Sequence, residues 1–222
     1  MAALSPRRVP KKRPGPEGGK RDRNRQEKTN ALLQGALSLF LASGIEGVTI
    51  DEIACAAGVA KGSFYRYFDD KTALVAALLH PLSQGMREAF STCDEALRAA
   101  RSPLDLASAY TNLSLALSTH VGSEKGAVRL YLQESRAPGV GAREPIARLA
   151  HDIYRAALVL TEAAHSHGLL RPIDPRVSAL AVIGAVERLL FSYLAGDDIG
   201  GPDRVARDLI SMVLDGLRER GH

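Results

Sequence analysis

Apolar positions recur at helical spacing through almost the whole chain beyond residue 28. Leu33, Ala36, Leu37 and Phe40 follow the i, i+3, i+4, i+7 pattern of one helix face, and Gly44 is placed to end that helix. No stretch alternates between apolar and polar residues for long enough to favour a strand. The pattern therefore predicts an all-α protein of roughly nine helices.

Several helix starts are marked by capping residues. Thr49 is followed three residues later by Glu52, which predicts a capping box before a helix that Gly58 ends. A second helix is predicted over 59–68. Proline near the first helical position predicts three further starts, at Ser102-Pro103, Asp174-Pro175 and Gly201-Pro202. Pro81 lies within a long helical pattern and predicts a kink or a break there.

Two short helices joined by a glycine turn predict a helix-turn-helix. The small Ala54 suits the helix crossing, and Gly58 suits a left-handed turn. The second helix is expected to bury Ala60, Phe64 and Phe68, which recur at i, i+4 and i+8. Four residues are then left facing outward: Lys61, Ser63, Tyr65 and Arg66.

The outward side chains suit contact with a nucleic acid. Lysine, arginine and hydroxyl groups at a helix N-terminus can contact phosphates, and Lys and Arg can also read guanine edges in a major groove. Lys71 opens the next helix, with Asp69 or Asp70 as the expected cap, and the positive end of the helix dipole favours a phosphate there. A solvated helical hairpin without a partner is the alternative.

Charge is concentrated at the N-terminus. Residues 1–28 hold ten Lys or Arg against three acidic residues, so this segment carries +7 while the whole chain carries +4. Because it has few apolar residues to bury, we expect residues 1–27 to form a disordered basic arm. The arm suits an anionic polymer such as DNA, but a solubilising tail or a nuclear-import signal remain alternatives.

Composition favours a cytoplasmic protein. Hydrophobic residues make up 45% of the 222, which is typical of a soluble globular chain. The longest apolar run has ten residues, too short to span a bilayer, and no secretory leader is expected, so no membrane partner is predicted. Cys55 and Cys93 are interpreted as reduced thiols, because two cysteines make neither a disulfide framework nor a zinc site.

Enzyme signatures are missing from the sequence. It contains no P-loop, G-x-G-x-x-G, H-E-x-x-H, G-x-S-x-G or S-x-x-K motif. The pair His165-x-His167 is more typical of a solvated helix end than of a metal site. We therefore expect no catalytic residues, no metal and no cofactor. A helical small-molecule enzyme and a ligand-independent architectural DNA-binding protein remain the alternatives to a regulator.

The segment GVTIDEIACAAGVAKGSFYRYFDDKTAL resembles the DNA-binding segment of tetracycline-repressor-type (TetR) transcriptional regulators. The resemblance covers roughly residues 28–75 and is specific in Gly-Ser-Phe-Tyr-x-Tyr-Phe followed by Lys. It implies a helix-turn-helix DNA-binding domain over 28–75 and a ligand-binding and dimerisation domain over 76–222. It further implies a homodimeric repressor that binds a palindromic operator and is released by a small molecule, with activation left open.

The resemblance also implies roles for individual residues. Phosphate contacts are expected from Thr49, Tyr65 and Lys71, with Tyr67 as a further candidate. Base-edge contacts are expected from Lys61, Ser63 and Arg66. Three arginines of the basic arm are expected to reach the flanking backbone or minor groove: Arg21, Arg23 and Arg25.

The second domain is expected to hold the effector. A mostly apolar cavity with a few hydroxyls would suit a lipophilic ligand with one or two polar groups. The candidate lining residues lie on amphipathic stretches, where plain core is the alternative: Met86, Phe90, Tyr110, Leu113, Leu117, Tyr131, Tyr154, Leu158 and Thr161. Apolar stripes over 175–195 and 202–219 match the family's four-helix dimer interface, and internal core is again the alternative.

Overall fold

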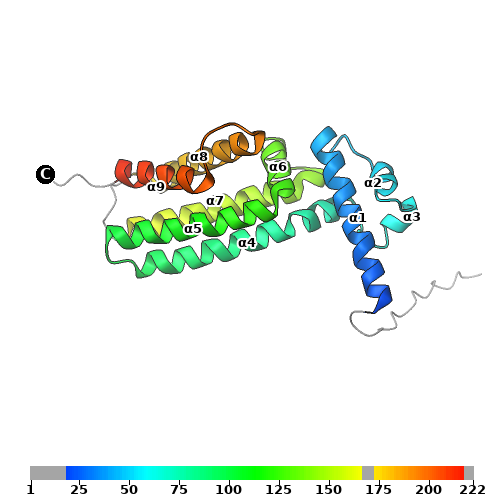
Figure 1. Ribbon diagram of the computed structural model, residues 1–222, viewed down its shortest axis with the longest axis horizontal. Coiled ribbons are helices and arrows are strands. Elements are labelled where there is room, and N and C mark those ends of the chain that lie inside the picture. The colour runs from blue at the N-terminus through cyan, green and yellow to red at the C-terminus, as the bar shows by residue number, and fades with distance from the viewer. Residues whose placement is uncertain (1–18, 167–172, 218–222) are drawn as a thin grey trace, which may run out of the picture.

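The computed structural model describes residues 19–166 and 173–217, which form nine α-helices and one short 3₁₀ helix without a strand (Figure 1). The predicted all-α fold is confirmed within these residues. The elements are α1 (Lys20–Ser43), α2 (Ile50–Ala56), α3 (Lys61–Phe64), α4 (Lys71–Ala99), α5 (Pro103–Ser123), α6 (Lys125–Glu134), η1 (Gly141–Arg143), α7 (Glu144–His165), α8 (Pro175–Ala195) and α9 (Pro202–Leu217).

The helices divide into a head and a body. The head consists of α1, α2 and α3, and it lies at one end of an elongated body formed by α4 to α9 (Figure 1). Within the body, α4 packs extensively against both α5 and α7, while α8 packs on α7 and α9 on α5. Helix α4 begins beside the head and runs along the body, so it connects the two parts directly (Figure 1).

One hydrophobic core joins the head to the body. It includes the fully buried Phe40 and Phe64 of the head together with Leu74, Leu130 and Ile146 of the body. The expected domain boundary after residue 75 therefore falls inside α4 and inside this core. A second, smaller buried cluster lies between α4, α5 and α7, around Cys93, Leu97 and Leu160.

The capping residues expected from the sequence do begin helices. The capping box of Thr49 and Glu52 opens α2, and the side chain of Asp70 accepts a hydrogen bond from the backbone of Ala73 at the start of α4. Ser102 and Asp174 cap α5 and α8 in the same way. These local hydrogen bonds were predictable because both partners lie within four residues.

Two of the expected helix boundaries were wrong. Helix α1 already begins at Lys20, so residues 20–27 of the expected disordered arm are helical. This segment is rich in Arg, Lys, Gln and Glu, which favour helix once the buried Leu32 anchors it.

Helix α3 is also shorter than the expected 59–68. After Phe64 the N–H groups of Arg66 and Tyr67 bond to the carbonyl of the third preceding residue, which tightens the turn. Ala60, which was expected to be buried, is an exposed N-cap.

Pro81 does not break α4. The helix runs from Lys71 to Ala99 without interruption, although the proline nitrogen cannot donate a hydrogen bond. Buried neighbours on both sides of the proline, Leu79 and Leu82, pack into the main core and hold the helix in place. The helix is therefore not broken at Pro81, and the expected kink stays a prediction.

Gly58 and Gly62 allow a matched test of the turn before α3. Gly58 has φ of +63° and Gly62 does not have a positive φ, yet a Cβ at either position would meet no other atom within 4 Å. Gly58→Ala should therefore lower the free energy of unfolding by about 1 kcal/mol through backbone strain alone. Gly62→Ala should be neutral or slightly stabilising, because alanine favours helix. Urea unfolding measures both, and equal losses would contradict this account.

Candidate nucleic-acid interface and ligand cavity

Helix α3 presents a basic and phenolic surface at the end of the head. Lys61, Tyr65 and Arg66 are exposed, with Tyr65 at 52%, while Ser63 is half-buried and accepts a hydrogen bond from Arg66 Nη2 at 3.2 Å. Tyr67 is half-buried and packs against the core. The expected outward face is thus present, and it contains Lys61, Tyr65 and Arg66 with Ser63 at its edge.

Lys61 is paired with a carboxylate. Its Nζ lies 2.8 Å from Asp51 of α2, and this hydrogen bond raises the pKa of Lys61. Both side chains are more than half exposed, and solvent screening leaves an exposed pair of this kind with little effect on stability. A DNA phosphate or base could therefore replace Asp51 as the partner of Lys61 at little cost.

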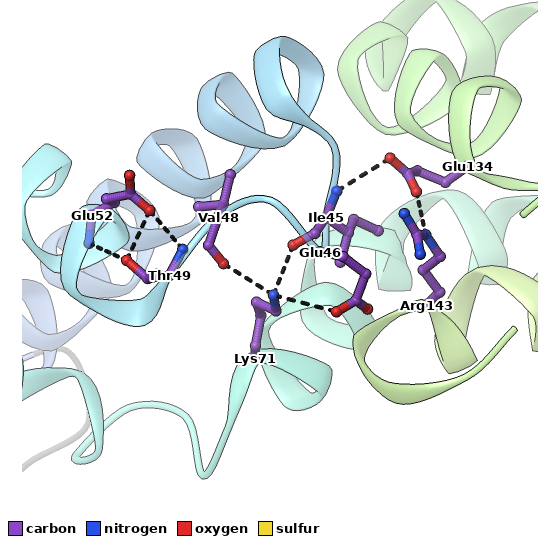
Figure 2. Close-up of polar contacts among 8 residues, drawn as sticks. All are labelled: Ile45, Glu46, Val48, Thr49, Glu52, Lys71, Glu134 and Arg143. Atoms are coloured by element: carbon purple, nitrogen blue, oxygen red, sulfur yellow. Dashed lines mark hydrogen bonds and ion pairs between the residues drawn. The ribbon is translucent and has the colours of Figure 1, made fainter. Parts of the chain in front are cut away.

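Lys71 opens α4 as the sequence suggested, but its ammonium is bound within the protein. Its Nζ donates to the carbonyls of Ile45 at 2.8 Å and Val48 at 3.0 Å, and lies 3.9 Å from Glu46 (Figure 2). The side chain is only 19% exposed. The ammonium thus holds the loop between α1 and α2, residues 44–49, against the start of α4. In the free protein these bonds occupy the ammonium, and the expected phosphate contact of Lys71 stays a prediction.

Thr49 is fully engaged in its capping box. Its Oγ1 accepts from the backbone of Glu52 at 3.3 Å and donates to the carboxylate of Glu52 at 2.8 Å, and Thr49 N donates to the same carboxylate at 2.7 Å (Figure 2). These hydrogen bonds lower the pKa of Glu52, with the backbone bond as the larger cause. The box fixes the first turn of α2, and the expected phosphate contact of Thr49 remains a prediction.

Glu134 of α6 was missed by the sequence analysis. It is 4% exposed, accepts a hydrogen bond from Ile45 N at 3.2 Å, and forms an ion pair with Arg143 at 2.6 Å (Figure 2). The neighbouring Gln133 donates to the carbonyl of Phe40 at the end of α1. Residues 45 and 134 are 89 positions apart, so no local pattern could have paired them.

The N-terminal turns of α1 carry further arginines. Arg23 and Arg25 are exposed and precede the first buried residue of the helix, Leu32. This part of α1 projects beyond the rest of the head (Figure 1). The side chain of Arg21 lies outside the described residues, as do residues 1–18.

A cavity of about 370 Å³ lies in the body between α4, α5, α6, α7, α8 and α9. Its walls are almost entirely apolar. Seven of the nine expected lining residues face it: Met86, Phe90, Tyr110, Leu113, Leu117, Tyr131 and Thr161. The expectation was wrong for Tyr154 and Leu158, because α7 turns other positions, Ile153, Ala157 and Leu160, toward the cavity.

Several polar groups in the cavity walls are bound within the protein. Tyr131 donates to Glu187 Oε1 at 2.7 Å, and Arg136 lies 2.8 Å from the other oxygen of that carboxylate. Burial, followed by the bond to Glu187, raises the pKa of Tyr131. Tyr110 donates to the carbonyl of Leu160 at 3.4 Å, and burial raises its pKa as well. Both phenols are therefore neutral at physiological pH.

Helices α8 and α9 have two apolar faces each. Their inner faces line the cavity, through Val186 and Leu190 of α8 and Leu209 of α9, for example. Their outer faces expose Leu180 at 58% and Met212 at 64%. By length and composition alone, α8 is apolar enough to cross a membrane. The cavity wall accounts for one of its apolar faces and leaves the other uncovered.

Comparisons with known proteins agree on one family. Residues 32–78 match the family described as bacterial regulatory proteins, tetR family. The transcriptional regulator RutR of Escherichia coli K12 is 31% identical over 163 residues, which cover 71% of each chain. The transcriptional repressor BepR of Brucella suis is 26% identical over 201 residues, covering 86% of this chain and 92% of its own.

A solved structure shows the same fold. The transcriptional regulator FadR from Bacillus subtilis, in complex with stearoyl-CoA, superposes with a TM-score of 0.60 at 16% identity. The match covers 85% of this chain and 99% of FadR. The helical body described here is therefore shared with a protein whose structure holds a lipid-derived ligand.

Lys71 can be tested by its effect on stability. Lys71→Met removes the donor of two charge-assisted hydrogen bonds to half-buried carbonyls, so the free energy of unfolding should fall by about 2 kcal/mol. Lys28→Met, at an exposed position of α1, should change it by less than about 0.5 kcal/mol. Urea unfolding compares the two variants, and a small, equal effect of both would show that Lys71 does not hold the loop.

Proposed function

This chain belongs to the TetR family of DNA-binding transcriptional regulators, and from that premise we propose that it is a ligand-released repressor. It acts in the cytoplasm as a homodimer on a palindromic operator. A small, mostly apolar effector in the cavity releases it from DNA. The observation that carries the proposal is a basic α3 surface and an apolar cavity connected by one continuous helix, α4.

The α3 surface is assigned to the major groove. Lys61, Ser63 and Arg66 approach base edges, while Tyr65 and Thr49 contact phosphates. The short helix has a slim N-terminal end, which can enter the groove. Lys71 supports this surface by holding the loop that carries Thr49, and Tyr67 supports it by packing on the core.

The arginines at the start of α1 are assigned to DNA beside the operator core. Arg23 and Arg25 are exposed on a part of α1 that projects from the head, and Arg21 precedes them in sequence. Contacts of this kind add salt-dependent affinity and carry little sequence information. They would strengthen binding to all duplexes while α3 supplies the preference.

The outer faces of α8 and α9 are assigned to the dimer. An exposed apolar surface on two adjacent helices is typical of an interface, and a two-fold axis would pair the same helices from each copy. Such a dimer must place its two α3 helices about 34–36 Å apart to fit successive major grooves. The spacing is thus the property that an effector can change.

The cavity is assigned to the effector. Its apolar lining suits a lipophilic compound, in line with the stearoyl-CoA bound by FadR, and BepR is a repressor by name. An effector that binds a conformer with a wider α3 spacing draws the population away from DNA. The extent of release is limited by the difference in effector affinity between the two conformers.

Sequence-specific DNA binding is the first prediction of the proposed function. Fluorescence anisotropy with the DNA upstream of the gene should show a preference over a scrambled duplex that persists at higher salt. Arg66→Ala should weaken binding to the upstream DNA about tenfold, because a base-edge contact is lost. Arg155→Ala, at an exposed position of α7, should leave it unchanged. Equal binding of both duplexes, lost together with salt, would instead indicate an architectural protein.

The dimer face gives a second prediction. Leu180→Glu places a charge in the proposed interface and should shift the protein from the mass of two chains to that of one in light scattering. Leu115→Glu is the control, because Leu115 is similarly exposed but lies on α5. A dimer that survives Leu180→Glu, or one that Leu115→Glu disrupts, would place the interface elsewhere.

A further inference from the structure

His120 stands out among the polar groups of the cavity. It lies in the last turn of α5, and its side chain forms part of the cavity lining. Unlike Tyr131 and Glu187, which bind each other, the His120 ring has no hydrogen-bond partner among the described residues. The hydroxyls of Ser114 and Ser118 line the same side of the cavity, also without a partner in the described part of the chain. Helix α5 thus offers unused hydrogen-bonding groups to whatever fills the cavity.

The ring of His120 also rests directly on α4. It lies against Gly85, where a Cβ would overlap the ring atoms Cε1, Nδ1 and Cγ. Gly85 is buried and has an ordinary helical conformation, so backbone geometry does not require glycine there. The space that a side chain would fill at residue 85 is occupied by the imidazole. Any shift of the ring toward α4 must therefore move the helix.

The contact between His120 and Gly85 lies one turn from Pro81, where α4 can bend. Gly85 follows Pro81 by one turn, and Pro81 leaves the carbonyl of Ala77 without its usual helical donor. A helix with a missing bond bends more readily at that point. On the other side of Pro81, α4 leads back to Lys71, whose ammonium holds the loop before α2. A displacement at Gly85 can thus reach the elements that position α3.

We propose that His120 receives the polar group of the effector and passes its binding on to α4 through the contact with Gly85. This rests on the proposed function and adds the chemical class of the ligand. The effector is a compact apolar molecule with one hydroxyl or carbonyl group, which an imidazole can pair with as donor or acceptor. A cationic group is not favoured, because the one carboxylate among the described lining residues, Glu187, is already neutralised by Arg136.

The coupling contact is tested without any ligand. In Gly85→Ala the new methyl group displaces the His120 ring, which should mimic the effector and weaken binding to the upstream DNA about tenfold. His120→Ala in the same chain removes the overlap and should restore affinity to within about twofold of wild type. Gly122→Ala is the control, because a Cβ at this position of α5 meets no atom within 4 Å.

Two results would overturn the proposed coupling through the contact of His120 with Gly85. One is an unchanged affinity of Gly85→Ala for the upstream DNA. The other is a double variant, Gly85→Ala with His120→Ala, that binds this DNA as weakly as Gly85→Ala alone. Circular dichroism checks that each variant is folded. If Gly85→Ala alone does not fold, His120→Leu decides: it should bind upstream DNA normally and resist 2-naphthol at a concentration that is expected to release the wild type. Release of His120→Leu at the same 2-naphthol concentration would overturn the proposal.

Recognition of the polar group is tested with a matched pair of probes. Naphthalene and 2-naphthol differ by one hydroxyl, and calorimetry gives the affinity of each. His120→Leu should weaken 2-naphthol about fivefold, the usual contribution of one hydrogen bond, and leave naphthalene unchanged. Equal changes for both probes would show that His120 contributes only packing, against the proposal.

The outcomes separate this inference from the proposed function. If the wild type does not distinguish upstream from scrambled DNA, the repressor assignment fails. If it does distinguish them but binds neither probe, the effector cavity is assigned wrongly, and the role of His120 falls with it. If the wild type distinguishes the duplexes and binds both probes, and the His120 variants bind DNA and probes as the wild type does, only the role of His120 is wrong.

Discussion

The loop between α1 and α2 depends on two polar side chains that reach it from the body. Lys71 of α4 binds two of its carbonyls, and Glu134 of α6 binds the N–H of Ile45. The cation thus holds backbone acceptors and the carboxylate holds a backbone donor. Burying a carboxylate is costly unless it is paired, and Arg143 supplies the pair. The loop in turn fixes the capping box of α2 and the direction in which α3 leaves it. The orientation of the DNA-binding surface is therefore set by helices of the body.

The same arrangement explains why head and body act as one unit. Their apolar residues form a single core that α4 crosses, so the head cannot tilt without repacking Leu74 and Leu130. Packed cores change between discrete arrangements more readily than they deform continuously. Helix α6 contributes twice, because Glu134 faces the loop while Tyr131 faces the cavity. A ligand that displaces either α4 or α6 would thus change the hydrogen bonds of Lys71 or Glu134 to the loop between α1 and α2.

Sequence patterns revealed those features whose causes are local. The capping residues, the glycine turn and seven of the nine expected cavity residues follow from local spacing, and so does the outward face of α3. The failures have non-local causes. Lys71 was placed correctly at a helix start, but the carbonyls that bind it lie 23 and 26 residues away. Glu134 and Glu187 were missed because their partners come from other helices, and Tyr154 because helical spacing does not fix which face of α7 meets the cavity.

Helix α8 takes part in two proposed contacts, one on each side. Its inner face lines the cavity and its outer face is the proposed dimer surface, so the effector and the second copy would bind opposite sides of one helix. Any movement of α8 that improves one contact alters the other. Thermodynamic linkage then requires that an effector that changes the affinity of dimerisation also binds the monomer and the dimer with different affinities. The small residues Ala181 and Gly184 on the exposed side would let the partner helix approach closely, which makes this coupling sensitive to small shifts.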